Sequence, residues 1–317
     1  MTPKERQEWL AERRKGIGGS DVAAILGMSP WATPLTVWLD KTGRAPDKPE
    51  TEAMRIGTEL EDFVARRYAQ ETGRVVQRFN KMLHKGCFLG NLDRLVVPEG
   101  QKVASHMGEI RTDTLLECKT TSVDWTDGVP LYYVTQVQHY MGLDERLKHA
   151  DVAALFLTHK RFETYRVERD DEVIKAMQTR LAAWWDEYVV GGKMPPPSCE
   201  EDNKIIYAIS SPGKKIVAND DIKRKLEQFK EAKAAEKAAK EQGEKLKTEI
   251  CAFMKDAEAL MDDEDNILAT WKNNRDKCKT DWEGLALALN ASTEQVAAYT
   301  ITSPGDRPFK PKATKAA

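Results

Sequence analysis

The sequence is poor in cysteine, and its cysteines are not arranged as metal or disulfide sites. Five of them are scattered over 317 residues, and no two form a Cys-x-x-Cys pair. This odd, widely spaced set argues against a zinc ribbon or an iron–sulfur cluster and indicates reduced thiols in a cytoplasm. A chain of this length can bury a sufficient core without disulfides.

Long hydrophobic runs and an excess of either charge are also lacking. The longest apolar runs are too short to span a bilayer, and the opening residues, MTPKERQEWLAERR, contain no apolar segment of the signal-peptide type. We therefore expect neither secretion nor membrane insertion. The net charge of −2 gives no global signal for nucleic-acid binding, so such binding would need a local basic surface or an enclosed channel.

The sequence does contain an ordered series of helical and strand-like segments. The first predicted helix spans 3–15. A second, short helix has Ser20 or Asp21 as its N-cap and ends at Gly27, and a third begins after Thr33. Later segments predict strands of one sheet, two further strands and more helices. The strand-like segments are 75–84, 88–100, 114–121 and 150–168, and the helical ones are 131–143 and 172–192.

This pattern predicts an α/β (α+β) domain in which helices flank a central mixed sheet. We place the domain at 1–197, where three consecutive prolines break regular structure, and a linker at 198–219. The Lys/Glu/Ala-rich remainder, 220–317, predicts a charged helical extension with a small strand and a basic tail. Its helix is either one long exposed helix or a hairpin broken near Gly243, and the strand is expected within 266–276.

An acid and a lysine stand close together in the strand-like run TLLECKTT. The strand period of two places Glu117 and Lys119 on one face, while Leu116 and Cys118 point to the other. One explanation is a surface cross-strand charge pair, which would contribute little to stability. The other is a catalytic pair at the end of an apolar strand.

Asp93 favours the second explanation. It stands in the middle of the apolar run FLGNLDRLVV, where an unpaired carboxylate would be costly to bury. If Asp93 and Glu117 lie at adjacent strand ends, their oxygens can share a hard divalent cation, with a backbone carbonyl near Cys118 completing the cage. Lys119 could then orient or deprotonate a metal-bound water and help to neutralise charge developing on a phosphate.

Glu61 is a further candidate. On the helix predicted around it, Glu61 shares a stripe with Val64 and Tyr68, on or beside the buried face. A glutamate in such a place is more often salt-bridged than catalytic, although the same metal centre could recruit it. Its neighbours Glu59 and Asp62 fall elsewhere on the helix and can simply be solvated.

The order of these motifs resembles that of the YqaJ viral recombinase family, which is similar to phage lambda exonuclease and belongs to the PD-(D/E)xK nuclease superfamily. The motifs run within the first 195 residues as GIGGSD, Gly57-x-x-x-Glu61, Asp93, Glu117-Cys-Lys119 and QVQHYM from Gln136. The resemblance implies a restriction-endonuclease-like core and a deoxyribonuclease that uses one or two Mg²⁺ ions, for which Mn²⁺ can substitute. Such an enzyme would digest double-stranded DNA 5′ to 3′ from an end and leave a 3′ single strand for phage-type homologous recombination by strand annealing.

The resemblance also implies roles for the acidic residues and the lysine. Asp93 and Glu117 would be the principal metal ligands, joined by the backbone of Cys118. Glu61 would be an additional acid near the metal, and Lys119 would be the catalytic lysine.

Three more positions have binding roles by resemblance. Gln136 would hold the catalytic lysine or the attacking water through hydrogen bonds, and Arg13 and Ser20, on either side of the glycine turn, would grip the 5′-terminal phosphate. Gln138 is interpreted as structural. The sequence lacks a literal Pro-Asp dipeptide, because Leu92 precedes the metal-binding aspartate, but the metal requires the carboxylate and not the proline.

The implied partners are duplex DNA with a 5′-phosphorylated end, further copies of the chain in a homotrimeric ring, and a single-strand annealing protein. All would be met in the cytoplasm of a bacterial or phage-infected host cell, with no membrane involved. An enclosing ring would reconcile the near-neutral charge with a DNA substrate. Two alternatives stay open: a structure- or site-specific endonuclease of the same superfamily, and a non-catalytic DNA-end-binding recombination scaffold.

The glycine turn GIGGSD could also be compared with nucleotide-binding loops. It lacks the Gly-Lys-Ser/Thr sequence that cradles ATP phosphates, and Asp21 replaces the third glycine of a Rossmann loop. A tight turn that needs glycine explains much of it, and a terminal DNA phosphate is the anion that it could hold.

Overall fold

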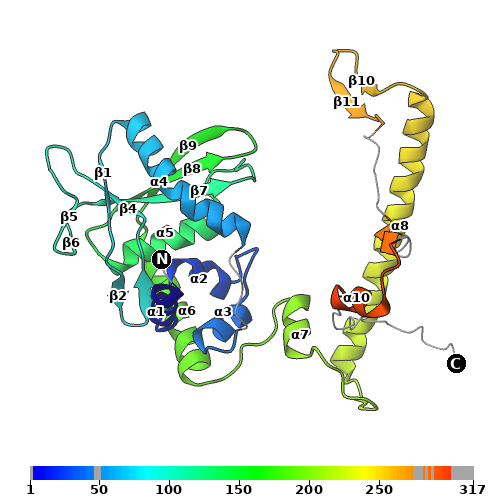
Figure 1. Cartoon of the computed structure of the whole chain (residues 1–317), viewed down its shortest axis with the longest axis horizontal. Helices are drawn as coiled ribbons and strands as arrows, with labels where there is room; N and C mark the ends of the chain where they lie inside the picture. Colours follow the sequence, from blue (N-terminus) through cyan, green and yellow to red (C-terminus); the bar gives the residue numbers. More distant parts are fainter. Residues whose placement is uncertain (1–2, 46–50, 274–280, 283–284, 287–288, 301–317) are drawn as a thin grey trace. The chain divides into compact units, whose positions relative to one another are not determined.

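The protein is described here by a computed structural model that covers residues 3–45, 51–273, 281–282, 285–286 and 289–300. The chain divides into two compact units, Met1–Tyr207 and Ala208–Ala317, and Figure 1 labels most of their elements.

The first unit is built on a five-stranded sheet with the strand order β1–β4–β7–β8–β9. β4 (Arg94–Val96) is antiparallel to both of its neighbours, β1 (Val76–Arg78) and β7 (Thr114–Thr121). β8 (His149–Phe156) is parallel to β7, and β9 (Arg161–Glu168) is antiparallel to β8. The expected α/β (α+β) class with a central mixed sheet is therefore confirmed.

Helices cover both faces of this sheet (Figure 1). α4 (Glu52–Thr72) packs on the face that carries Leu116, whereas α5 (Leu131–Leu143) packs on the face that carries Leu115. Consecutive strand residues point to opposite faces, so these two leucines assign one helix to each side. α6 (Asp171–Trp184) contacts α5 and continues directly into a π-helix, Trp185–Val190.

Three short helices precede the sheet, as the sequence predicts. They are α1 (Pro3–Arg14), α2 (Gly19–Ile25) and α3 (Pro34–Lys41). The hydroxyl of Thr33 caps α3 by accepting a hydrogen bond from the Thr36 N–H at 3.2 Å. Gly27, with φ of 76°, ends the turn after α2 in the left-handed region that favours glycine.

The N-cap prediction for α2 is wrong. Gly18 holds that position, and Asp21 is the third helical residue, whose Oδ2 accepts a hydrogen bond from the Gly18 N–H at 2.8 Å. The same oxygen lies 2.6 Å from Nζ of Lys41 on α3, and both residues are buried. A buried ion pair thus fixes the glycine turn, while Ser20 is left exposed on its surface.

The segments 75–84 and 88–100, predicted as strands of one sheet, are each divided between two sheets. β2 (Leu83–Lys85) and β3 (Phe88–Gly90) form a separate hairpin, which Ile17 extends by pairing in parallel with Phe88. Because the chain bends between β3 and β4, Asp93 lies directly before β4 and not in the middle of a strand. A second small hairpin joins β5 (Ser105–His106) and β6 (Glu109–Ile110).

A short helix, α7 (Glu200–Ile206), lies within the segment interpreted as a linker, 198–219. Its Asp202 is fully buried and accepts hydrogen bonds from the Thr33 hydroxyl at 2.7 Å and from the Ser198 N–H at 2.8 Å. These bonds hold the end of the first unit against the start of α3.

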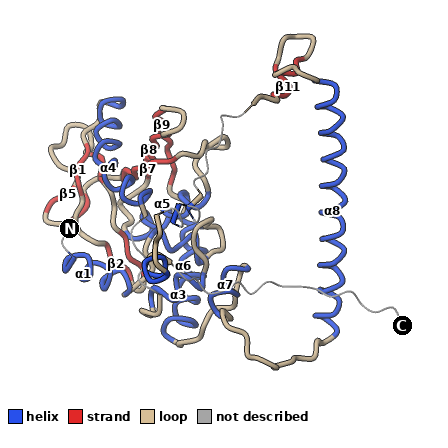
Figure 2. The backbone as a smooth tube through the Cα atoms, turned by 45° about the vertical axis from the view of Figure 1, so that its right-hand side comes forward, coloured by secondary structure: helices blue, strands red, loops and turns tan. Residues whose placement is uncertain are grey.

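The second unit begins with α8 (Asp220–Met254), a continuous helix of 35 residues that Figure 2 shows without interruption. The alternative of a break near Gly243 is therefore wrong: glycine costs a helix only about 1 kcal/mol relative to alanine, and strong helix formers surround it. β10 (Ala259–Met261) and β11 (Ile267–Thr270) follow as a hairpin that includes the expected strand, and α10 spans Thr293–Ala298.

The predicted basic tail, 307–317, lies outside the described residues. Among the helices that are described, none combines the length and the apolar character needed to cross a membrane.

Candidate active site

Glu117 and Lys119 project from β7 toward α5, on the face predicted by the strand period. The Lys119 ammonium donates a hydrogen bond to Glu117 Oε1 at 2.7 Å. Glu117 is 2% exposed and the Lys119 side chain 15% exposed. The pair is thus buried, which excludes the explanation of a solvated surface pair.

Gln136 on α5 completes a closed set of hydrogen bonds with this pair. Its Nε2 donates to Glu117 Oε1 at 2.8 Å, and its Oε1 accepts from Lys119 Nζ at 3.1 Å. The same Nε2 donates to the hydroxyl of Tyr140, one helical turn further on, at 3.0 Å. The lysine is therefore held from the strand and from the helix at once.

Asp93 is hydrogen-bonded to the backbone of β7 at Cys118, the residue after Glu117. Its Oδ2 accepts a hydrogen bond from the Cys118 N–H at 2.8 Å. Burial, followed by the nearby Glu117 carboxylate, raises the pKa of Asp93 well above its ordinary value. Burial alone would lower the pKa of Lys119, but the carboxylates of Glu117 and Asp93 outweigh it and raise that pKa, so the lysine is an ammonium ion.

These residues fit a hard divalent cation. Glu117 Oε2 is buried and has no hydrogen-bond partner in the part of the chain that the structure describes. A cation shared with Asp93 would satisfy this oxygen and remove the repulsion between the two carboxylates. Over the same described residues, no group of three His, Cys, Asp or Glu side chains is placed to hold a metal.

Cys118 can take part only through its backbone. Its side chain packs with Val64, Leu116 and other apolar residues on the α4 face of the sheet. Burial there, followed by the Asp93 carboxylate, raises the pKa of the thiol. A buried neutral thiol is inert, which agrees with the expectation that the carbonyl is the relevant atom.

Glu61 lies on α4 and is bound by Arg94, which pairs with Leu116 across β4 and β7 and so shares its face. Arg94 Nη1 donates to Glu61 Oε1 at 2.6 Å and is itself 4% exposed. Asp62 is exposed, as expected, and also accepts a hydrogen bond from Arg94. The structure gathers Asp93 and Glu117 but gives Glu61 a partner of its own, and the metal role of Glu61 stays a prediction.

Arg13 and Ser20 lie beside the same site. Arg13 Nη2 donates to the Ser20 hydroxyl at 3.0 Å. Both residues line a cavity of about 200 Å³ that also contains Asp93, Gln136 and Tyr140. Segments from three parts of the chain thus bring both predicted phosphate-binding residues and one predicted metal ligand, Asp93, to one cavity.

Gln138 does not belong to this arrangement. Its Nε2 donates to the Glu168 carbonyl at 2.6 Å, and its Oε1 accepts from the Asp170 N–H at 3.0 Å. It ties α5 to the end of β9 and to the N-cap of α6, which agrees with a structural role.

Two residues that hold the site were missed from the sequence. The ring of Tyr140 lies so close to Gly19 that a Cβ there would be 2.5 Å from it. Its spacing of four residues from Gln136 on a helix could have indicated a shared face. Lys41, which donates to the Arg13 carbonyl at 2.9 Å as well as pairing with Asp21, gave no local signal, because both contacts are distant in sequence.

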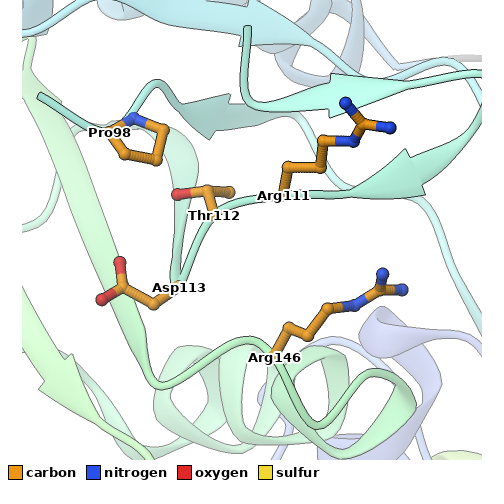
Figure 3. Close-up of a pocket in the computed structure, with 5 residues that line it drawn as sticks. All are labelled: Pro98, Arg111, Thr112, Asp113 and Arg146. Atoms are coloured by element: carbon orange, nitrogen blue, oxygen red, sulfur yellow. The ribbon is translucent and has the colours of Figure 1, made fainter. Parts of the chain in front are cut away.

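A second cavity, of about 340 Å³, lies near the amino end of β7 and is lined by Pro98, Arg111, Thr112, Asp113 and Arg146 (Figure 3). Arg146 is paired with Asp144 at 2.7 Å and with Glu109 at 3.1 Å. This cavity contains none of the predicted site residues, and the charge of Arg146 is already balanced.

Comparison with known proteins gives matches in sequence and in structure. The profile of the YqaJ-like viral recombinase domain matches residues 8–146. The "Uncharacterized protein YqaJ" of Bacillus subtilis (strain 168) is 36% identical over 267 residues, which are 80% of this chain and 79% of that protein.

Similar solved structures include an alkaline exonuclease, LHK-Exo, from Laribacter hongkongensis, which is 21% identical with a TM-score of 0.44 and covers 58% of this chain and 93% of its own. A phage-related exonuclease from Haemophilus somnus 129PT is 14% identical with a TM-score of 0.44 and covers 56% of this chain and 96% of its own. The family resemblance rests on the sequence matches, whose identity and coverage confirm it: the chain belongs to the YqaJ-like viral recombinase family.

Proposed function

We propose that this protein is a Mg²⁺-dependent deoxyribonuclease that digests double-stranded DNA from its ends in the 5′ to 3′ direction. The observation that carries the proposal is the buried Glu117 near Asp93. One of its oxygens is hydrogen-bonded to Lys119 and Gln136, and the other has no hydrogen-bond partner among the residues that the structure describes. Membership of a viral recombinase family supports a role on DNA.

Each residue of the site has a task in phosphodiester hydrolysis. The carboxylates of Asp93 and Glu117 would hold Mg²⁺, which supplies positive charge against the scissile phosphate. The Lys119 ammonium, fixed by Glu117 and Gln136, adds positive charge where negative charge develops in the transition state. In this arrangement Lys119 serves as a positively charged, hydrogen-bond-donating group.

The cavity favours an end of DNA as substrate. Arg13 presents a guanidinium beside the Ser20 hydroxyl, and both groups suit a terminal phosphate that accepts several hydrogen bonds. Asp93 lines the same cavity, so a 5′-phosphate held there would leave the adjoining nucleotide near the carboxylates. Digestion of this strand would leave a 3′ single strand suited to an annealing protein.

We further propose a homotrimeric ring around the duplex. The formal net charge of the chain is only −2, so strong attraction for DNA requires that Lys and Arg be concentrated on an inner surface. A monomer in light scattering at micromolar concentration would contradict this assembly.

The test uses linear duplexes labelled at one 5′ or one 3′ end, with and without a 5′-phosphate, and Mg²⁺. Glu117→Gln and Lys119→Met are expected to lower the digestion rate by about 10²-fold or more while duplex ends still bind. Lys148→Met, which removes an exposed lysine near β8, is the matched control and should digest normally. Arg13→Ala should erase the preference for 5′-phosphorylated ends.

Two further measurements separate the alternatives. Covalently closed circular duplex should stay intact, and its cleavage would identify an endonuclease instead. Calorimetric titration of Mn²⁺ should give heat with the wild type and little with Asp93→Asn, whereas equal heats would contradict the metal site. Full digestion by Glu117→Gln would refute the proposed chemistry.

A further inference from the structure

An aromatic cluster extends outward from the candidate catalytic lysine. Lys119 Nζ lies 4.5 Å from the ring centroid of Tyr133. The Tyr133 ring meets Tyr132 edge-on at 4.5 Å between centroids, and Tyr132 meets Trp31 edge-on at 4.9 Å. We name Trp31, Tyr132 and Tyr133 the aromatic ledge.

The outer member of the ledge is exposed although its backbone is fixed. Trp31 lies in the loop between α2 and α3 and is 69% exposed. The Ser29 hydroxyl accepts hydrogen bonds from the N–H groups of Trp31 and Ala32 at 3.2 and 3.3 Å, which holds this loop in a turn. A large ring kept in water on an ordered turn is therefore available for a ligand.

The position of the ledge indicates which ligand this is. Tyr132 and Tyr133 lie in the first turn of α5, and Gln136 in the next turn binds both Glu117 and Lys119. A group stacked on the ledge would thus lie beside the phosphodiester that these residues are proposed to cleave. Flat aromatic rings next to a cation suit a nucleobase, and stacking accepts every base because each has a π-face.

We propose that the aromatic ledge stacks a nucleobase of the DNA strand adjacent to the cleaved phosphodiester, with Trp31 as a positioning residue. The inference rests on the proposed function, and it adds a contact to the base where Arg13 and Ser20 address only the phosphate. A contact of this kind positions the nucleotide without reading its sequence, as digestion of any DNA end requires. A protein docked on the ledge would instead cover Tyr133 and obstruct the lysine.

The experiment reads stacking directly and needs no digestion. Duplexes carry 2-aminopurine at one of the first four nucleotides from a 5′-phosphorylated end, and Ca²⁺ replaces Mg²⁺. Stacking on the ledge should quench the fluorescence at one of these positions with the wild type and with Trp31→Phe, and Trp31→Ala should relieve that quenching. Trp31→Ala should also raise the dissociation constant about tenfold, in the range expected for one stacked base.

Two controls keep the result specific. Trp271→Ala removes an indole that is 51% exposed in the second unit and should leave the fluorescence unchanged. In digestion with Mg²⁺, removing the base at the responsive position of the duplex should raise the KM of the wild type about tenfold. The KM of Trp31→Ala should be the same for the abasic and the intact duplex, because this variant already lacks the stacking contact. A structural defect would lower kcat for both duplexes and would not depend on the base.

The outcomes also separate this inference from the proposed function. If DNA is digested but Trp31→Ala quenches 2-aminopurine as strongly as the wild type, the ledge proposal is refuted while the nuclease stands. If the quenching depends on Trp31 but no DNA is digested, the stacking contact is supported and the nuclease proposal is refuted.

Discussion

Replacing Gly19 with alanine is expected to disturb the candidate active site through Tyr140, which supports Gln136. A Cβ at this position would lie 2.5 Å from the Cε1 and Cζ atoms of Tyr140 and 2.6 Å from its hydroxyl. Tyr140 is only 6% exposed, and its hydroxyl accepts the hydrogen bond from Gln136. Since an enclosed ring cannot swing into solvent, the added methyl group must displace either the ring or the glycine turn.

The size of the effect follows from two opposing contributions. Overpacking of a closed interior costs about 1 to 3 kcal/mol. Alanine gains at most about 1 kcal/mol over glycine in a helix, and less at the first helical position, which Gly19 occupies. We therefore expect a net loss of about 1 to 2 kcal/mol in the free energy of unfolding. Displacing the Tyr140 hydroxyl from Gln136 should also lower the digestion rate about tenfold, corresponding to one hydrogen bond.

The assay combines denaturant unfolding with end-labelled digestion. Gly18→Ala is the matched control on the same turn, because its Cβ would meet only Asp21 Oδ2, at 3.3 Å, and its cost is that of a weaker N-cap. In a Tyr140→Leu background the stability cost of Gly19→Ala should largely vanish, whereas that of Gly18→Ala should persist. If Gly19→Ala costs the same in both backgrounds, the contact with Tyr140 is not its cause and the reasoning fails.

Three other substitutions test the framework of the fold. Lys41→Met leaves the buried Asp21 carboxylate unpaired and should lower the free energy of unfolding by about 3 kcal/mol, measured by denaturant unfolding; adding Asp21→Asn should recover part of the loss, and no recovery would contradict the ion pair. Burial and the hydrogen bond to Asp151 raise the pKa of Tyr68 to about 12. The resulting stability is present below pH 10.0 and lost as the pH rises through about 12, so Tyr68→Phe should flatten the alkaline limb of the pH–stability curve, and an unchanged limb would exclude this contribution. Gly243→Ala, where an added Cβ meets open space, should raise helicity by circular dichroism and stabilise α8 by up to about 1 kcal/mol; a loss of helicity would show that the glycine is required.

Elements with local signals were predicted closely. The segment 131–143 is α5 and 114–121 is β7, because apolar residues recur along each of them and Pro or polar residues mark their ends. The start of α3 followed from the Thr33 cap and the proline after it. These features depend on neighbours within one or two turns of chain.

Features that depend on distant partners were not predicted. Nothing local distinguishes β2 and β3, which form their own hairpin, from β1 and β4, which join the central sheet. Asp62 is exposed as expected, but its place on the helix gave no indication of the hydrogen bond from Arg94, a residue of another element. Asp21 was expected as a cap, and its pairing with Lys41 depends on how α3 packs beside α2.

The candidate site shows the same division. The sequence by itself determined that Glu117 and Lys119 share a face, because side-chain direction in a strand follows from its period. The spacing of Gln136 and Tyr140 on a helix carries the same kind of signal, although it was missed. Only the tertiary structure decided that Asp93 reaches β7 beside Glu117, whereas Glu61 on α4 is bound by Arg94 of β4. Strand pairing and helix packing bring together residues that are far apart in the chain, and no local sequence pattern indicates which carboxylates will lie close together.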